Sequence, residues 1–190
     1  MIKLIWMCRA IILKLFTNNF GLLSYIGKPV YTSGLKGWSF GRKVRIYPHA
    51  RIEVFPAAKL IIENDVSIGQ NLHIICANEI KIGSKTTISA NVYIADVDHT
   101  FDNVTEHVMQ QPLHVSSTCI GENSFIGYGS VILPGATLGK SCVVGANSVV
   151  KGNFPDYCML AGSPAKIIKR YHVVEKCWKR TEANGTFLSD

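Results

Sequence analysis

The 190-residue chain lacks the motifs of several common protein classes. Its six cysteines include no C-x-x-C pair and no zinc-binding spacing, so they predict neither a redox centre nor a structural zinc site. We expect them to be reduced, buried and structural, which favours a cytoplasmic protein. No serine lies in a nucleophile-elbow motif, so nucleophilic catalysis has little support. With 47% hydrophobic and 17% charged residues, the composition excludes a disordered chain.

A membrane-spanning segment is also missing. Residues 2–16 are strongly apolar, but Lys3, Arg9 and Lys14 keep the uncharged stretches too short to cross a bilayer. No small-residue cleavage site follows, so we expect no signal peptide. The segment fits an amphipathic helix, and two hypotheses for its role stay open. In the first, the helix packs on the rest of the protein or on a neighbouring subunit. In the second, it makes a peripheral contact with the cytoplasmic membrane through its basic residues and Trp6.

The net charge of +7 indicates an anionic partner. Nucleic acid is not expected as a partner, because the chain has no basic stripe interleaved with aromatic residues and no recognition-helix pattern. A phosphorylated cofactor is the other candidate. Residues 164–190 are interpreted as a basic C-terminal helix and tail, with the helix over 165–180. Lys166 and Lys169 would share one face of that helix and bind a phosphate.

The strongest pattern in the chain is an aliphatic residue at every sixth position. Glycine often follows the aliphatic residue directly, and a small residue stands four positions after the aliphatic residue. A period of six matches neither a helix nor a flat strand, but it is typical of a parallel β-helix in which each hexapeptide forms one wall of a coil. The aliphatic side chain then points inward and stacks on its copy about 4.8 Å away. The repeated residues are Ile120, Ile126, Ile132, Leu138, Val144 and Val150.

This repeat sets the expected domain boundaries. It runs from about 41 to 163, so residues 1–40 are expected to form an apolar helix followed by loop and turn. Residues 96–117 interrupt the repeat with a stretch that lacks aliphatic phasing and is rich in His, Asp and Gln. A loop of this length inside a regular scaffold is usually functional. We therefore expect the active site at 96–117, where a loop or a neighbouring subunit overhangs the coil.

His99 is the candidate catalytic residue of this loop. Imidazole is suited to acid–base chemistry near neutral pH, and Asp96 or Asp98 is close enough in sequence to fix its tautomer. Two alternatives stay open. His99 is a surface residue, or it converges with His73 and a later loop histidine on a metal ion. No H-x-x-x-H pair supports a metal, so we expect none.

Four motifs stand out within residues 60–170: Ile126-Gly127, Leu133–Ala136, Val144–Val150 and Ala161–Lys166. Through them the chain resembles the hexapeptide-repeat acyltransferases, which include maltose, galactoside, serine and xenobiotic O-acetyltransferases. The chain is most similar to the branch that acetylates sugars of lipopolysaccharide, O-antigen and capsule. This resemblance implies a mainly β fold, a left-handed parallel β-helix, which is an exception to the usual right-handed crossover. It also implies a homotrimer that binds acetyl-CoA between subunits and a sugar or glycan acceptor.

The resemblance assigns roles to individual residues. The family's catalytic histidine follows an Asn-Val-x-aliphatic segment, here Asn91–Ile94, and falls on His99. The acceptor side falls on Asn71 and Asp98. The implied contacts with acetyl-CoA are Tyr128, Ala146, Lys151, Lys166 and Lys169, the two last near the 3′-phosphate.

The expected reaction is direct transfer of an acetyl group from acetyl-CoA to a sugar hydroxyl, with His99 as general base and no covalent enzyme intermediate. Two other classes of protein share such a coil. A γ-type carbonic anhydrase would bind zinc stoichiometrically, and a non-catalytic scaffold would not bind CoA. The acyltransferase is the favoured interpretation.

Overall fold

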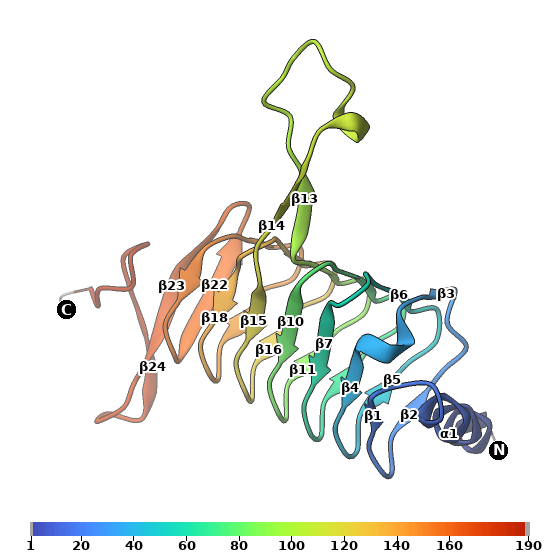
Figure 1. Ribbon diagram of the computed structural model, residues 1–190. Coiled ribbons are helices and arrows are strands. Elements are labelled where there is room, and N and C mark those ends of the chain that lie inside the picture. The colour runs from blue at the N-terminus through green and yellow to red at the C-terminus, as the bar shows by residue number, and fades with distance from the viewer. Residues whose placement is uncertain (1, 189–190) are drawn as a thin grey trace.

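A computed structural model describes residues 2–188, which form a parallel β-solenoid of about seven turns (Figure 1). The parallel β-helix expected from the repeat is confirmed, as is the left-handed, mainly β fold that the resemblance implied. Each complete turn contributes one short strand to each of three sheets, which run side by side along the coil. The corners between sheets are tight turns, and their exposed side chains recur at regular intervals along the molecule.

Every strand pair within the coil is parallel, and the sheets are named A, B and C. Sheet A holds β1 (Asn19–Phe20), β4 (Trp38–Phe40), β7 (Lys59–Ile62), β10 (Glu79–Ile82), β15 (Thr118–Ile120), β18 (Thr137–Leu138) and β21 (Asn153–Phe154). Sheet B holds β2 (Tyr25–Ile26), β5 (Arg45–Ile46), β8 (Ser67–Ile68), β11 (Thr87–Ile88), β16 (Phe125–Ile126), β19 (Val143–Val144) and β22 (Cys158–Gly162). Sheet C holds β3 (Tyr31–Thr32), β6 (Arg51–Val54), β9 (His73–Cys76), β12 (Tyr93–Ala95), β17 (Val131–Ile132) and β20 (Val149–Val150).

The core is a set of aliphatic columns inside the coil. Ile126 lies in register with Ile88 of the preceding turn and Val144 of the following turn, and all three are fully buried or nearly so. The small residues of the repeat face the same interior. The Ser124 hydroxyl accepts the backbone N–H of Cys142 at 3.2 Å, and the Ser130 hydroxyl donates to the carbonyl of Gly145 at 3.0 Å. The buried serines therefore satisfy backbone groups at the corners.

The coil begins earlier than the sequence predicted. Residues 17–40, expected to be loop and turn, contain β1, β2 and β3 of the first turn and continue into β4. Their glycines were interpreted as loop residues, yet they lie at corners where the next turn passes very close. A Cβ on Gly21 would come within 2.4 Å of the Gly41 backbone, and one on Gly27 within 2.5 Å of Pro48. Glycine is required there because two backbones touch.

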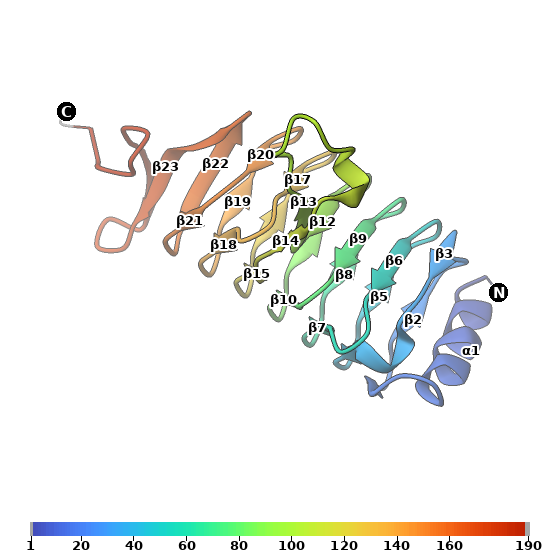
Figure 2. The same ribbon diagram turned by 45° about the horizontal axis from the view of Figure 1, so that its top comes forward.

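The predicted N-terminal helix is confirmed as α1 (Ile2–Lys14). It lies across the open end of the first turn, against β1 and β2 (Figures 1 and 2). Trp6 and Ala10, four residues apart, are buried against the coil. The Arg9 guanidinium donates to the carbonyl of Ile26 at 2.9 Å, so α1 also covers the exposed edge of sheet B. None of the described helices is long and apolar enough to cross a membrane.

The predicted C-terminal helix is wrong. Residues 165–180 form two strands, β23 (Ala165–His172) and β24 (Cys177–Arg180), which extend sheet B beyond β22 with antiparallel pairing. Ala165 and Ile167 are buried while Lys166 between them is exposed, and this alternation has the period of a strand. The spacing of the lysines suggested a helix, but the free edge of β22 provides backbone partners that favour a hairpin.

The inward stack predicts a sharp contrast between neighbouring residues of β16. Ile126→Ala opens a cavity in the middle of the aliphatic column, so we expect a loss of about 2–5 kcal/mol in the free energy of unfolding. Phe125→Ala is the matched control, because Phe125 precedes Ile126 in the same strand and is 44% exposed. Urea unfolding curves of the two variants measure this difference. Equal losses would contradict the placement of the core.

Candidate active site

The segment that interrupts the repeat is a projecting arm with a hairpin at its base. It leaves the coil between sheet C and sheet A and rises away from it (Figure 1). β13 (Val97–His99) pairs antiparallel with β14 (Leu113–Val115), so that Asp98 faces His114 across the hairpin. A 3₁₀ turn, η2 (Val108–Gln110), lies near the tip. The expected loop is therefore ordered, and His99 ends its first strand.

The base of the arm is fixed to the neighbouring turn of the coil. Asp96 is fully buried, and its carboxylate accepts the backbone N–H groups of Ala77 at 2.6 Å and Asn78 at 2.8 Å. The backbone carbonyl of Asp96 accepts the N–H of Ser116 on the returning strand at 2.8 Å. The hydroxyl of Thr118 donates to the carbonyl of Ala95 at 2.8 Å. Asp96 therefore anchors the arm, and it does not orient the imidazole as the sequence suggested.

The His99 side chain is half-buried and lacks an orienting partner in a single copy of the chain. Its Nδ1 is buried and makes no hydrogen bond within residues 2–188. Asp98 is exposed, and its carboxylate accepts the backbone N–H of His99 at 2.8 Å. Neither of the two predicted carboxylates therefore fixes the ring. A buried imidazole nitrogen without a partner is costly, so this ring is incompletely satisfied in one chain.

A row of polar side chains runs along the corner between sheets B and C. The Asn71 amide donates to the Asn91 side-chain oxygen at 2.8 Å, and the Asn91 amide donates to the Tyr128 hydroxyl. These residues occupy the same corner in three successive turns. Asn71 and Asn91 have φ values of 58° and 60°, a left-handed conformation that asparagine tolerates. Asn71 and Tyr128, predicted for the acceptor and the cofactor respectively, are thus linked through Asn91.

Asn91 is a residue to which the sequence analysis gave no binding role. The available signal was its position, because it follows Asn71 by one complete turn of the coil and falls on the same corner. The next turns place Tyr128 and then Ala146 on that corner, and both side chains are exposed. The Asn147 N–H donates to the carbonyl of Tyr128 at 2.8 Å, which fixes the spacing of these two turns.

The three remaining residues assigned to the cofactor lie elsewhere on the coil. Lys151 follows β20 and is exposed at the corner between sheets C and A. Lys166 pairs with Ala161 and Lys169 with Met159, while Ile168 between them is left unpaired as a bulge. The bulge shifts the alternation by one residue, so both lysines lie on the outer face of sheet B. The expected shared face exists, although it belongs to a strand.

We call the corner between sheets B and C that carries Asn71 and Asn91 the asparagine corner. His99 and this corner lie at opposite ends of the strands of sheet C, which we call its two edges. The arm leaves β12 at Asp96, whereas Asn91 stands before β12 at the other edge. At about 3.3 Å per residue the two edges are roughly 16 Å apart. One copy of the chain therefore does not bring the imidazole to the side chains that would hold a cofactor along the asparagine corner.

His73 belongs to an ion-pair cluster on the outer face of sheet C. Its Nε2 lies 3.6 Å from the Glu53 carboxylate, which also accepts a hydrogen bond from Arg51 at 2.7 Å. Tyr93 packs edge-on against the His73 ring. Burial raises the pKa of the Tyr93 phenol, and the carboxylates of Asp98 and Glu53 raise it further. No three His, Cys, Asp or Glu side chains within the described part of the chain are arranged to hold a metal ion.

The cysteines form no disulfides, and their burial differs from the expectation for two of them. Cys76, Cys142 and Cys158 are buried, but Cys8 and Cys177 are exposed. Burial, with a smaller contribution from the Asp96 carboxylate, raises the pKa of Cys76 to about 12. That thiol stays protonated near neutral pH, so Cys76 does not provide a nucleophile.

Two family models match parts of the coil. The model described as bacterial transferase hexapeptide (six repeats) matches residues 118–152, and that of the hexapeptide repeat of succinyl-transferase matches residues 59–95. The putative lipopolysaccharide biosynthesis O-acetyl transferase WbbJ of Escherichia coli K12 is 28% identical over 88% of this chain and 87% of its own length. The carnitine operon protein CaiE of a Proteus species is 31% identical over 70% of this chain and 71% of its own length.

Solved structures show the same fold. AntD, an N-acyltransferase from Bacillus cereus solved with dTDP and 3-hydroxybutyryl-CoA, superposes with a TM-score of 0.75 at 21% identity, over 88% of this chain and 91% of that one. The sequence repeat, the relatives that extend over most of the chain and the shared coil agree. The chain belongs to the hexapeptide-repeat family of acyltransferases.

Proposed function

We propose that the protein is an acetyl-CoA-dependent O-acetyltransferase that acetylates a sugar hydroxyl of a cell-surface glycan or its precursor. The observation that carries the proposal is the half-buried imidazole of His99, held on an arm whose base is fixed by Asp96. The similarity to a putative lipopolysaccharide O-acetyl transferase supports the glycan acceptor. The acyl-CoA complex of AntD supports CoA as the carrier.

In this mechanism His99 removes the proton from the acceptor hydroxyl as its oxygen attacks the thioester carbonyl of acetyl-CoA. The tetrahedral intermediate collapses with cleavage of the carbon–sulfur bond. The CoA thiolate leaves and takes the proton from the imidazolium, which restores the neutral ring. Backbone N–H groups stabilise the oxyanion. Because both substrates are held together, no covalent enzyme intermediate is needed.

The donor occupies the second half of the coil in this proposal. Tyr128 and Ala146 contact the pantetheine side of acetyl-CoA at the asparagine corner, and Lys151 lies at the adjacent corner. Lys166 and Lys169 bind the 3′-phosphate from the outer face of sheet B. Their shared face supports this role, because two ammonium groups on one surface attract a phosphate more strongly than one.

The acceptor lies on the N-terminal side of the donor, with Asn71 and Asp98 as its proposed contacts. Asp98 is exposed next to His99, and the Asn71 amide belongs to the row that reaches Tyr128. A hydroxyl held between Asp98 of one copy and Asn71 of a neighbouring copy would be within reach of both the base and the thioester. We place the enzyme in the cytoplasm, peripheral to the inner membrane through residues 2–16.

The active site is completed by a second copy of the chain in a homotrimer. Three observations support this proposal: the separation of the two edges of sheet C, the missing partner of His99 Nδ1, and the apolar surface of the arm. Phe101 is 74% exposed and Val104 is 94% exposed, yet the tip is ordered by the Gln111 amide, which donates to two backbone carbonyls. A fixed arm with exposed apolar side chains fits against a neighbouring subunit.

Replacement of the proposed base tests the mechanism. His99→Ala should lower kcat by about 10²–10⁴-fold, because general base catalysis typically supplies that factor. His114→Ala is the matched control, since it removes an imidazole from the opposite strand of the same hairpin. Thiol release from acetyl-CoA with a panel of glycans gives the rates, and thermal unfolding checks the fold. Wild-type turnover in His99→Ala would remove His99 from the mechanism.

The phosphate site predicts a selective effect on the donor. Lys166→Ala combined with Lys169→Ala should raise the KM for acetyl-CoA by at least about tenfold and leave the KM for the acceptor nearly unchanged, because charge-assisted bonds to phosphate are lost. Lys85→Asn with Lys176→Asn is the control, because it removes the same charge and asparagine tolerates the left-handed φ of both positions. An unchanged KM for acetyl-CoA would refute the placement.

Mixed oligomers test whether the site is shared. When His99→Ala chains are co-expressed in equal amounts with Lys166→Glu/Lys169→Glu chains, about a quarter of the shared sites combine two intact halves. Each variant alone should be nearly inactive, and the mixture should recover roughly that fraction of the wild-type rate. If each chain formed its own site, every chain in the mixture would be defective, and no recovery would be seen.

A further inference from the structure

Helix α1 is apolar on the side that faces away from the coil. Trp6 and Ala10 pack inward, yet the opposite side of the helix presents a second set of large apolar side chains. Leu15 is 80% exposed and Ile11 68%. A helix with apolar side chains on two opposite sides requires a second apolar partner. The outward-facing set is Leu4, Ile5, Ile11 and Ile12 on α1, with Leu15 and Phe16 in the turn that follows it.

The apolar surface continues from α1 onto the first turn of the coil. Leu22 and Leu23 form the corner between β1 and β2, and both are more than half exposed. A crevice of about 400 Å³ separates this corner from the helix, with Met7 and Ile11 on its helical wall. We call this combined surface of α1 and the Leu22–Leu23 corner the end face of the coil. It is a contiguous apolar area of the kind that marks an interaction site.

Charge is strongly asymmetric at this end of the molecule. The first 52 residues hold nine of the 20 Lys and Arg and none of the 13 Asp and Glu. Among the described residues, Arg45 and Arg51 are the only two of the nine in ion pairs. Six of the others are exposed. Two are lysines of α1, and three lysines and one arginine lie on the corners of the first two turns. These exposed residues are Lys3, Lys14, Lys28, Lys36, Arg42 and Lys43.

We propose that the end face docks on an anionic lipid bilayer. An apolar centre with a basic rim and no carboxylates matches a membrane whose acyl chains accept the apolar side chains and whose headgroups attract the rim. Two copies packed end face to end face are a poor alternative, because that self-complementary contact would place one basic rim against another. This surface extends beyond residues 2–16 to include the corners of the coil.

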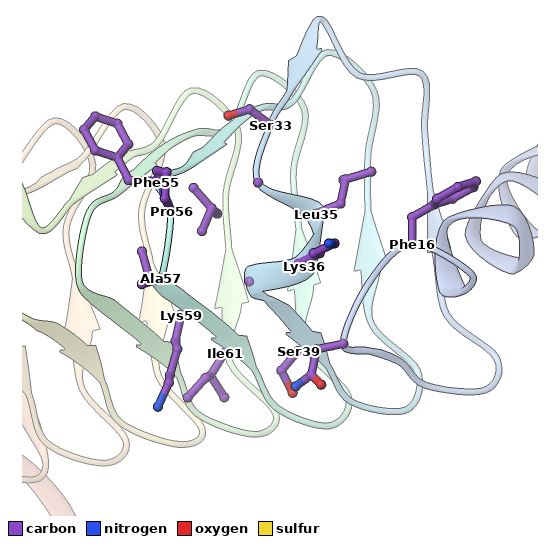
Figure 3. Close-up of a pocket in the computed structure, with 15 residues that line it drawn as sticks. Phe16, Ser33, Leu35, Lys36, Ser39, Phe55, Pro56, Ala57, Lys59 and Ile61 are labelled. Atoms are coloured by element: carbon purple, nitrogen blue, oxygen red, sulfur yellow. The ribbon is translucent and has the colours of Figure 1, made fainter.

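The docked orientation bears on the acceptor, and this part rests on the proposed function. An apolar groove of about 1200 Å³ begins at Phe16, beside the end face, and follows the corner between sheets C and A past Leu35 to Phe55 (Figure 3). Lys36 and Lys59 also line it. The arm with His99 leaves the same corner two turns further on, which is about 10 Å along the coil.

The bilayer, the groove and the arm therefore follow one edge of the molecule. An acceptor that stays anchored in the bilayer by a hydrocarbon chain would lie along the groove, with its phosphate near the two lysines and its sugar toward His99. The geometry points to a lipid-linked glycan as the acceptor class. A freely soluble sugar would make no use of the groove.

Vesicle flotation tests docking without requiring activity. The full chain should bind vesicles of phosphatidylglycerol and phosphatidylcholine, and bind phosphatidylcholine alone at least about tenfold more weakly. Lys3→Gln with Lys14→Gln should weaken binding about 25-fold, because each basic residue contributes about fivefold at an anionic surface. Ile12→Gln with Leu15→Gln should weaken it by at least about tenfold. Val173→Gln with Val174→Gln, exposed residues far along the chain, should have no effect.

Equal binding to both lipid compositions, or wild-type binding by the α1 variants, would overturn the proposal. If the α1 variants instead change the particle mass in light scattering and leave vesicle binding intact, a second copy covers the end face and the proposal is wrong. Thiol release with a water-soluble acceptor should be unchanged in the α1 variants. Absence of thiol release in the wild type with every acceptor would count against the O-acetyltransferase and leave vesicle binding as a separate result.

Discussion

The stack of aliphatic side chains inside the coil is the constraint on which the rest of the structure depends. Ile88, Ile126 and Val144 lie in register in successive turns and exclude water completely or nearly so. Because each turn repeats the position of the one before, every corner of the coil also repeats. The row from Asn71 to Tyr128 is straight for that reason, and the arm projects from a fixed place on the opposite edge of sheet C.

This rigid arrangement distributes the chemistry over two edges that do not meet within one chain. The Asp96 carboxylate accepts hydrogen bonds from two backbone N–H groups of the coil, so it fixes the direction of the arm. His99 lies on this arm, and its buried Nδ1 has no hydrogen-bond partner within residues 2–188. In our account the neighbouring copy supplies the missing surroundings. Assembly, donor binding and base catalysis would therefore depend on one another.

The sequence predicted most where its pattern was strict and least where edges and corners decided the structure. The six-residue period from Ile120 onward predicted the coil, and the break after Ile94 located the arm. The first turn was missed because its two-residue strands and glycines look like loop. The prediction of a helix at 165–180 was wrong, because backbone pairing of β23 with β22 outweighs the helical spacing of the lysines. The roles of Asp96 and Asn91 depend on hydrogen bonds between turns, which no local pattern contains.

The two ends of the coil differ in chemistry, with an apolar and basic end face at the N-terminus and the paired lysines on sheet B near the C-terminus. In our account the first holds the acceptor's anchor, the second holds the donor's phosphate, and His99 lies between them. A structure of the oligomer with bound CoA tests this account most directly. It predicts the CoA sulfur beside His99 of one copy and the pantetheine along the Tyr128 corner of another. CoA bound by a single chain, or far from His99, would contradict it.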